Sequence, residues 1–123
     1  MEICVGEYVR IDKDHRIIAL GIAKVVKTIN ETIYVKNNFE LPITIDKNSI
    51  SKHSKNIIDL IEAGDYVNGY KVISVDYDVI NDKTECIELD LNNNYQYNFI
   101  SARQIKTIIT HEQFSSIEYK VGG

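Results

Sequence analysis

The chain has 123 residues, 44% of them hydrophobic and 26% charged, with one proline and six glycines. This composition is ordinary for a globular protein, and it excludes a disordered chain or a collagen-like repeat. The net charge is −4 at pH 7: residues 1–62 carry nine acidic and nine basic side chains, and residues 63–123 carry nine acidic and five basic ones. A broad basic surface, which non-specific nucleic-acid binding needs, is therefore not expected.

The first half of the chain shows the apolar–polar alternation of half-buried strands. Strands are expected at VGEYVRI (5–11), GIAKVVKTIN (21–30), TIYVKNN (32–38) and LPITID (41–46). The spacing of apolar residues then changes in SKNIIDLIEAG, which predicts a short helix over 54–61 with Ser54 as its N-cap and Gly64 near its end. Two helical turns are unstable alone, so this helix is expected to pack on the sheets.

The second half repeats this order of elements. Asn68-Gly69 is a tight-turn signal, and strands are expected at YKVISVDYDVI (70–80), TECIELDLN (84–92) and YQYNF (95–99). In the middle one of these, Ile87, Leu89 and Leu91 are expected to point inward, opposite Cys86, Glu88 and Asp90. Thr110 and Gln113 form a capping box, which predicts a second short helix bearing Phe114 and Ile117.

Two similar stretches, identical at three of five positions, begin the two halves: VGEYV at 5–9 and AGDYV at 63–67. Together with the repeated order of elements, they predict a mainly β protein of two tandem SH3-like small barrels, each followed by a short helix. The expected units are 1–62 and 63–121. Each would have only a marginal core alone, so we expect them to pack together.

Three stretches also resemble a known group of proteins: the opening VGEYVR, the central ISKHSKNIIDLIEAGDYVNGYKV (50–72) and the closing IKTIITHEQFSSIEYKV (105–121). They are similar to small uncharacterised proteins encoded by phages, prophages and other mobile elements of Gram-positive bacteria, clostridia especially. The resemblance implies an accessory protein that works inside a bacterial host. It transfers no catalytic residue, because the shared motifs carry no known chemistry.

An acidic segment in the second unit is a candidate surface for a protein partner. If its two strands pair as a hairpin, its carboxylates gather on one side, where like charges cost stability unless solvent or a partner compensates. In the functional interpretation, this surface imitates a nucleic-acid backbone or binds a basic partner. In the alternative interpretation, the hairpin is merely solvated and keeps the protein soluble. The residues are Asp76, Asp78, Asp82, Glu85, Glu88 and Asp90.

Two further candidate surfaces are aromatic and basic. Tyrosines confined to the second unit could contact a peptide or a single strand, or could pack within the hairpins; these are Tyr70, Tyr77, Tyr95 and Tyr97. The densest basic spot lies at the start of the predicted helix, where the alternative is a solvated surface; it comprises Lys52, His53 and Lys55.

Motifs for catalysis and metal binding are missing from the sequence. There is no G-x-S-x-G nucleophile elbow and no glycine-rich phosphate loop. Cys4 and Cys86 are far apart, which predicts free thiols in a reducing compartment, and the three histidines, His15, His53 and His111, lack the spacing of zinc ligands. We therefore expect no catalytic residue, no metal and no cofactor.

The sequence thus favours a non-enzymatic accessory protein that binds a host macromolecule, and a protein is the favoured partner. In one form of this hypothesis, the binding inhibits a bacterial defence system. A nucleic-acid-binding module is the alternative, and a small enzyme is third. No apolar run approaches the roughly 20 residues that span a bilayer, and MEICVGEYVR does not look like a secretory signal. A cytoplasmic location without membrane contact is therefore expected, and the sequence sets no oligomeric state.

Overall fold

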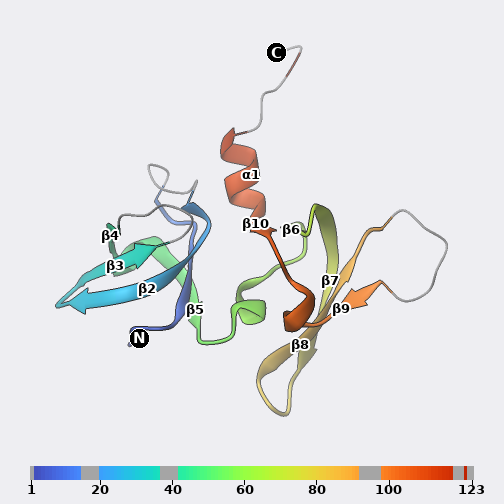
Figure 1. The fold of residues 1–123 in the computed structure, drawn as a ribbon, viewed down its shortest axis with the longest axis horizontal. Helices are drawn as coiled ribbons and strands as arrows, with labels where there is room; N and C mark the ends of the chain where they lie inside the picture. The colour runs from blue at the N-terminus through green and yellow to red at the C-terminus, as the bar shows by residue number, and fades with distance from the viewer. Residues whose placement is uncertain (1, 15–19, 37–41, 92–97, 118–120, 122–123) are drawn as a thin grey trace.

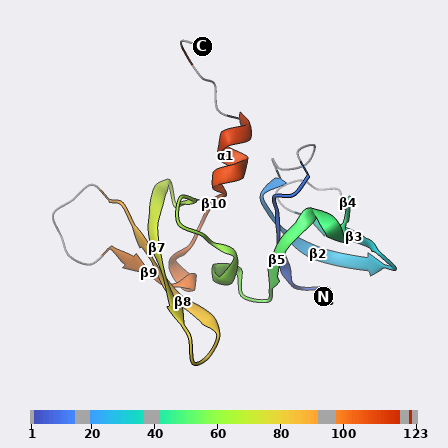
Figure 2. The same cartoon turned by 180° about the vertical axis from the view of Figure 1, so that it is seen from behind.

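The protein is mainly β and contains two antiparallel five-stranded sheets that lie side by side (Figures 1 and 2). The computed structural model describes residues 2–14, 20–36, 42–91, 98–117 and 121. The order of the first sheet is β4-β3-β2-β1-β5 and that of the second is β10-β6-β7-β8-β9. The expected doubling of a small β unit is therefore present at the level of strand order.

The strands of the first sheet are β1 (Tyr8–Ile11), β2 (Ile22–Ile29), β3 (Thr32–Lys36), β4 (Ile43–Asp46) and β5 (Ile50–Ser54). Those of the second are β6 (Tyr66–Val67), β7 (Tyr70–Asp78), β8 (Lys83–Leu89), β9 (Phe99–Ile100) and β10 (Ile108–Ile109). One-turn 3-10 helices precede the last strand of each sheet: η2 (Lys47–Ser49) before β5 and η4 (Ala102–Gln104) before β10.

Both sheets are open, which corrects the expectation of closed barrels. Within the described residues, β4 pairs only with β3 and β5 only with β1, while β9 pairs only with β8 and β10 only with β6. These edge strands are two to five residues long. Closure needs strands long enough to tilt and stagger around the barrel, and strands this short do not reach the opposite edge of their sheet.

Each sheet has its own hydrophobic core. The first is built by alternate residues of β1 to β5, among them Val9, Ile11 and Val35. The second contains Val67, Ile87 and other buried residues of β6 to β8. Ile58 and Ile61 belong to this second core, although the predicted unit boundary after residue 62 assigns them to the first unit. The segment between the sheets therefore packs on the second one.

The repeated stretch forms the same turn twice. In the first copy, Gly6 has a positive φ of 96°, its N–H donates to the Val25 carbonyl, and the Glu7 carboxylate accepts the Cys4 N–H at 2.6 Å. A residue with a side chain is strained at such a φ, which explains the glycine. The acidic residue at position 7 is explained by the Cys4 N–H of the turn, which its carboxylate accepts.

The second copy reproduces these bonds. Gly64 has φ 98° and donates to the Val72 carbonyl, while the Asp65 carboxylate accepts the Glu62 N–H at 2.7 Å. Strands β1 and β6 then begin at equivalent tyrosines. The similarity of VGEYV and AGDYV is therefore structural.

The two predicted helices have different outcomes. The capping box is confirmed: α1 (His111–Ile117) follows Thr110, whose hydroxyl accepts the Gln113 N–H at 3.1 Å. The helix expected over 54–61 is only a 3-10 turn, η3 (Ile57–Leu60), with Asn56 as its N-cap. Ser54 instead ends β5, because residues 50–54 pair along β1. Among the described residues, no helix is long and apolar enough to cross a membrane.

Candidate binding groove

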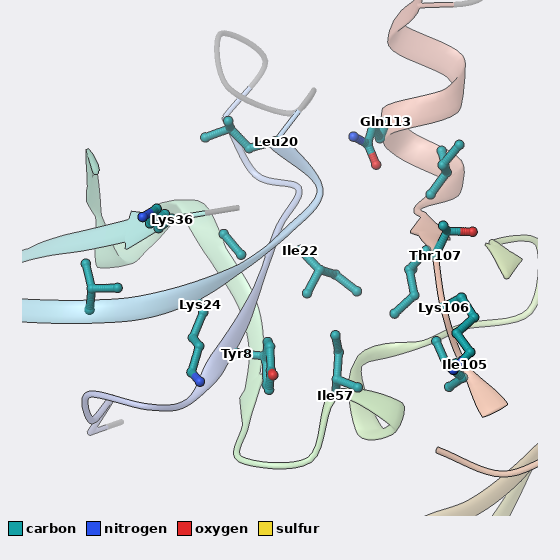
Figure 3. Close-up of a pocket in the computed structure, with 14 residues that line it drawn as sticks. Tyr8, Leu20, Ile22, Lys24, Lys36, Ile57, Ile105, Lys106, Thr107 and Gln113 are labelled. Atoms are coloured by element: carbon teal, nitrogen blue, oxygen red, sulfur yellow. The ribbon is translucent and has the colours of Figure 1, made fainter. Parts of the chain in front are cut away.

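A groove of about 850 Å³ lies between the two sheets (Figure 3). One wall is the outer face of the first sheet, with Tyr8, Ile22 and Val26; the other comes from η3 and the segment before α1, with Ile57, Ile105 and Ile109. We call this the inter-sheet groove. Because its walls come from segments about 20 to 100 residues apart, the groove exists only while the two units keep their relative position.

The charges of the inter-sheet groove are all positive. Lys24 and Lys36 lie on the first-sheet wall and Lys106 on the other, and no acidic residue lines the groove within the described parts of the chain. Lys24 and Lys36 are direct cross-strand partners on β2 and β3. The Lys24 ammonium lies over the Tyr8 ring, 5.7 Å from its centroid. A net-negative protein thus has a local positive groove with apolar walls.

A buried arginine fixes the two walls relative to each other. Arg10 lies on β1 between Val9 and Ile11, which point into the first core, so its side chain projects from the opposite face. It is fully buried, and its guanidinium binds the Asp65 carboxylate through two parallel hydrogen bonds of 2.6 and 2.9 Å. Such bidentate pairing fixes geometry as well as charge.

The same guanidinium reaches the segment after β5 and the helix α1. It donates to the Leu60 carbonyl at 2.8 Å and to Glu112 of α1 at 2.6 Å, and Glu62 lies 3.7 Å away. Burial lowers the pKa of Arg10, but the hydrogen bond and charge of Asp65 outweigh this effect and raise it above its ordinary value. We call Arg10, Glu62, Asp65 and Glu112 the Arg10 network; it joins β1 to η3, β6 and α1.

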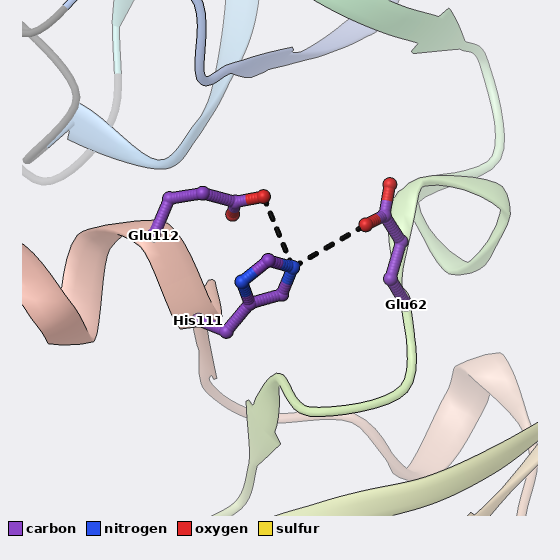
Figure 4. Close-up of side chains that lie close together, drawn as sticks. All are labelled: Glu62, His111 and Glu112. Carbon is purple, nitrogen blue, oxygen red and sulfur yellow. Dashed lines mark hydrogen bonds and ion pairs between the residues drawn. The ribbon is translucent and has the colours of Figure 1, made fainter.

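A histidine adjoins this network (Figure 4). A His111 ring nitrogen lies 3.0 Å from Glu112 and 3.4 Å from Glu62, and ligand atoms of the three residues lie within 4.8 Å of one another. Each carboxylate already has a cation: Arg10 for Glu112, and Lys52 for Glu62 at 2.8 Å. A metal ion would have to compete with both, so we interpret the cluster as an ion-pair network between the two sheets.

Electrostatics favour the charged form of Glu62. Burial raises the pKa of Glu62, but the Lys52 hydrogen bond and the Arg10 charge outweigh burial and leave it below the ordinary value. The predicted basic spot is therefore partly paired. Lys52 binds Glu62, and His53 lies 3.0 Å from Glu7. Lys55 is exposed, and its charge helps to lower the Glu7 pKa.

The predicted acidic residues all lie on or next to the hairpin of β7 and β8, away from the inter-sheet groove. Asp78 has a local role, because its carboxylate accepts the N–H groups of Ile80 and Asn81 at 3.0 and 3.2 Å and so shapes the turn. Asp82 occupies a turn position with φ 52°. A register shift between Asp76 and Tyr77 interrupts the strand alternation that would otherwise place Asp76 and Asp78 on one face, as the prediction that the carboxylates gather on one side requires.

The remaining acids surround a thiol or lie further along β8. Cys86 donates to Asp76 at 3.5 Å. Burial raises the pKa of the Cys86 thiol, and the charges of Asp76 and Glu85 raise it further. Glu88 accepts a hydrogen bond from Ser74 at 3.0 Å, and Asp90 is exposed. Ile87 and Leu89 are buried, as the alternation predicts.

The predicted tyrosine contacts do not come together at the inter-sheet groove. Tyr70 and Tyr77 are about half exposed on β7, and neither lines the groove. Tyr95 and Tyr97 lie outside the described residues. The aromatic residue that does line the groove is Tyr8, which the sequence suggested only as a structural member of the repeat.

Comparisons with protein-family models, with curated proteins and with solved structures gave no match.

Proposed function

We propose that this protein is a non-enzymatic accessory protein of phages or other mobile elements, and that it binds a host protein in the inter-sheet groove inside the bacterial cell. The observation that carries the proposal is the groove itself, whose walls are fixed by the buried Arg10 network. A preformed site loses less conformational entropy on binding than a site that must first be assembled. The phage-like sequence motifs supply the biological setting.

The architecture supports a binding role through its repeated topology. In both sheets the first strand of the unit lies between its second and fifth strands, and a 3-10 turn precedes the fifth. This order is the basis on which we propose that the units are two tandem SH3-like modules whose sheets remain open. Modules of this kind commonly bind extended peptides in grooves beside their sheets.

The chemistry of the described residues favours binding over catalysis. The lining of the inter-sheet groove is aliphatic apart from one tyrosine, three lysines and two uncharged polar residues, Thr107 and Gln113. The raised pKa of the Cys86 thiol disfavours the thiolate that a cysteine nucleophile needs. Neither feature supplies the adjacent nucleophile and base on which covalent catalysis depends.

A photocrosslinking experiment tests the binding surface. Benzoylphenylalanine replaces Val26 in the groove, or Ile80 at the exposed tip of the β7–β8 hairpin, and each protein is irradiated in nuclease-treated bacterial lysate. A discrete protein adduct from position 26, absent from position 80, is the expected result. An adduct only from position 80 would move the partner to the acidic hairpin. Adducts that form in untreated lysate but not in nuclease-treated lysate would favour nucleic acid as the partner.

Inhibition of a host defence system is the action that we propose for the bound state. Expression of the protein should then restore plaque formation by a phage that the host's nuclease otherwise excludes. The double variant Lys24→Glu/Lys36→Glu should lose this effect, whereas Glu88→Ser/Asp90→Ser on the acidic hairpin should retain it. The reverse result would identify the acidic hairpin as the inhibitory surface.

A further inference from the structure

We infer that the segment bound in the inter-sheet groove is an extended peptide in which acidic residues alternate with branched aliphatic ones. This inference rests on the proposed function and specifies the chemistry of the partner. It follows from three features that the groove has among the described residues: positive charge without an acidic partner, aliphatic walls and an unpaired strand edge.

The positive charge has no partner within the described residues. Three cations outside the groove have an acidic partner: Arg10 pairs with Asp65, Lys47 with Glu31 and Lys52 with Glu62. Lys24, Lys36 and Lys106 form no ion pair with any described residue, although the chain as a whole is net acidic.

The positions of these lysines add to the argument. Lys24 and Lys36 stand directly opposite each other on β2 and β3, where two like charges destabilise a sheet. A bound carboxylate between them would relieve that repulsion. Lys106 on the facing wall offers a second contact for an acidic residue.

The walls between the lysines fit aliphatic side chains. Val26 and Ile109 are 39% and 38% exposed and line the groove together, one on each wall. Ile22, Ile57 and Ile105 continue the apolar surface. A segment with aliphatic residues between its acids would cover this surface while its carboxylates reach the lysines.

An extended conformation is favoured by β10. This strand lines the groove and pairs on one side with β6, and within the described residues no strand pairs with its other side. The main chain of an extended peptide can pair with such an edge, leaving alternate side chains to contact the pocket.

Single-stranded nucleic acid fits the same surface less well. Proteins that bind single strands stack successive bases on several aromatic rings and use arginine as well as lysine. The inter-sheet groove has one aromatic residue, Tyr8, whose ring is already covered by the Lys24 ammonium, and no arginine lines it in the described part of the chain.

Selection from a random peptide library displayed on phage tests the inference. The wild-type protein should enrich peptides with at least two acidic residues separated by Val, Ile or Leu. A synthetic peptide of the enriched sequence should bind Lys24→Glu/Lys36→Glu at least about tenfold more weakly, because two attractions become repulsions. Lys71→Glu/Lys83→Glu makes the same charge change at exposed lysines outside the groove and should bind normally; circular dichroism checks that both variants fold.

The outcomes separate this inference from the proposed function. Enriched peptides without acids, or acidic peptides that bind both double variants equally, would overturn the inference while a position-26 adduct still supported protein binding. If no peptide is enriched, the inference fails; if position 26 also yields no adduct, the proposed function fails with it. The protein could instead bind a 20-nucleotide oligo(dT) probe more strongly than any peptide and lose this binding in Lys24→Glu/Lys36→Glu. That result would also overturn the inference and assign the groove to nucleic acid.

Discussion

Asp65 receives hydrogen bonds from three parts of the chain. Its carboxylate accepts two bonds from Arg10, one from the Glu62 N–H and one from the His111 N–H at the start of α1. Glu7, at the equivalent position of the first copy, caps its own turn and contacts His53. The same acid therefore stabilises a turn in both units, and in the second unit it also joins the two sheets.

Removing the guanidinium should strongly destabilise the protein. In Arg10→Ala, Asp65 would remain fully buried without its counter-charge, so we expect the free energy of unfolding to fall by about 3–5 kcal/mol. Urea denaturation followed by circular dichroism measures this. Lys71→Ala, at an exposed position of β7, is the control and should change stability by less than about 0.5 kcal/mol. A loss below about 1 kcal/mol in Arg10→Ala would mean that the network adds little to stability.

Acid should destabilise the folded state through Glu7 and Glu62. Burial raises the pKa of Glu7, but hydrogen bonds from the Cys4 N–H and His53 outweigh it, so both glutamates have pKa values below the ordinary one. The unfolded state then binds more protons than the folded state between the folded pKa and about 4.3. The stabilisation that Glu7 and Glu62 give to the folded state is therefore complete at a pH above their ordinary pKa, and it is lost as the pH falls through their folded-state pKa.

Urea denaturation at pH 7 and at about pH 3.5 measures this dependence. The variant Glu7→Gln/Glu62→Gln has nothing to protonate at these positions, so it should be less stable than wild type at pH 7 and should lose less on acidification. An equal loss in both proteins would show that other carboxylates determine the acid sensitivity.

Among the elements, the strands predicted best were those whose side-chain pattern is set locally. Ile33 and Val35 alternate with polar residues and are buried in β3, and Asn68-Gly69 forms the tight turn between β6 and β7. Strand β5 was missed because Ser51 to Ser54 are all polar, so no apolar alternation is visible; these residues form a strand by pairing with β1, about 40 positions earlier.

The inter-sheet groove could not be predicted for a similar reason. Lys24, Lys36 and Lys106 are isolated in the sequence, and only the packing of one sheet beside the other brings them together. A partial signal was present, because the predicted strands place Lys24 and Lys36 on exposed positions of neighbouring strands. The sequence carried no such signal for Arg10, because a single arginine in a strand is expected to be exposed unless a buried acidic partner is known.

The turn at Asn68 should matter more than its position in a hairpin suggests. Its side chain accepts the N–H groups of Lys106 and Thr107 at 2.7 and 3.1 Å and donates to the Gln104 carbonyl at 2.9 Å. These bonds hold the segment that forms one wall of the inter-sheet groove. Its φ of 54° is one that glycine adopts readily and alanine does not.

We therefore expect Asn68→Gly to cost about 1 kcal/mol, through the lost hydrogen bonds, and Asn68→Ala about 2 kcal/mol, through the lost bonds plus backbone strain. Asn30 is the matched control, because it has the same φ of 54° at the β2–β3 turn and its exposed side chain has no hydrogen bond to a described residue. Asn30→Gly should be near neutral in thermal denaturation. An equal cost at both positions would show that backbone conformation alone matters.

At the scale of the whole molecule, two separate apolar cores are joined largely by polar contacts. Among the described residues, the first core holds eight buried residues and the second six, and neither cluster contains residues of the other. Besides the Arg10 network, Asp59 of η3 accepts hydrogen bonds from Ser54 at the end of β5 and from the Thr84 N–H of β8. Each core is small, so we expect the stability of either sheet to depend on these polar contacts.

Hydrogen exchange measured by NMR can test this coupling amide by amide. In the wild-type protein, the slowest-exchanging amides of β2–β3 and of β7–β8 should report opening free energies within about 1 kcal/mol of each other, because the sheets open together. In Arg10→Ala, the second sheet should become the less protected one. It retains the buried Asp65 without a counter-charge.

The first sheet of Arg10→Ala loses an inter-sheet contact but keeps its core of buried residues, and the buried Asp65 lies outside that sheet. Its slowest amides should therefore keep more protection than those of β7–β8, by more than about 1 kcal/mol. The groove would be lost with the coupling, so the same variant should fail to form the position-26 crosslink while its first sheet is still folded. If both sheets lost protection equally, the protein would unfold as one unit even without Arg10, and the contacts around Asp59 would be sufficient to couple the two cores.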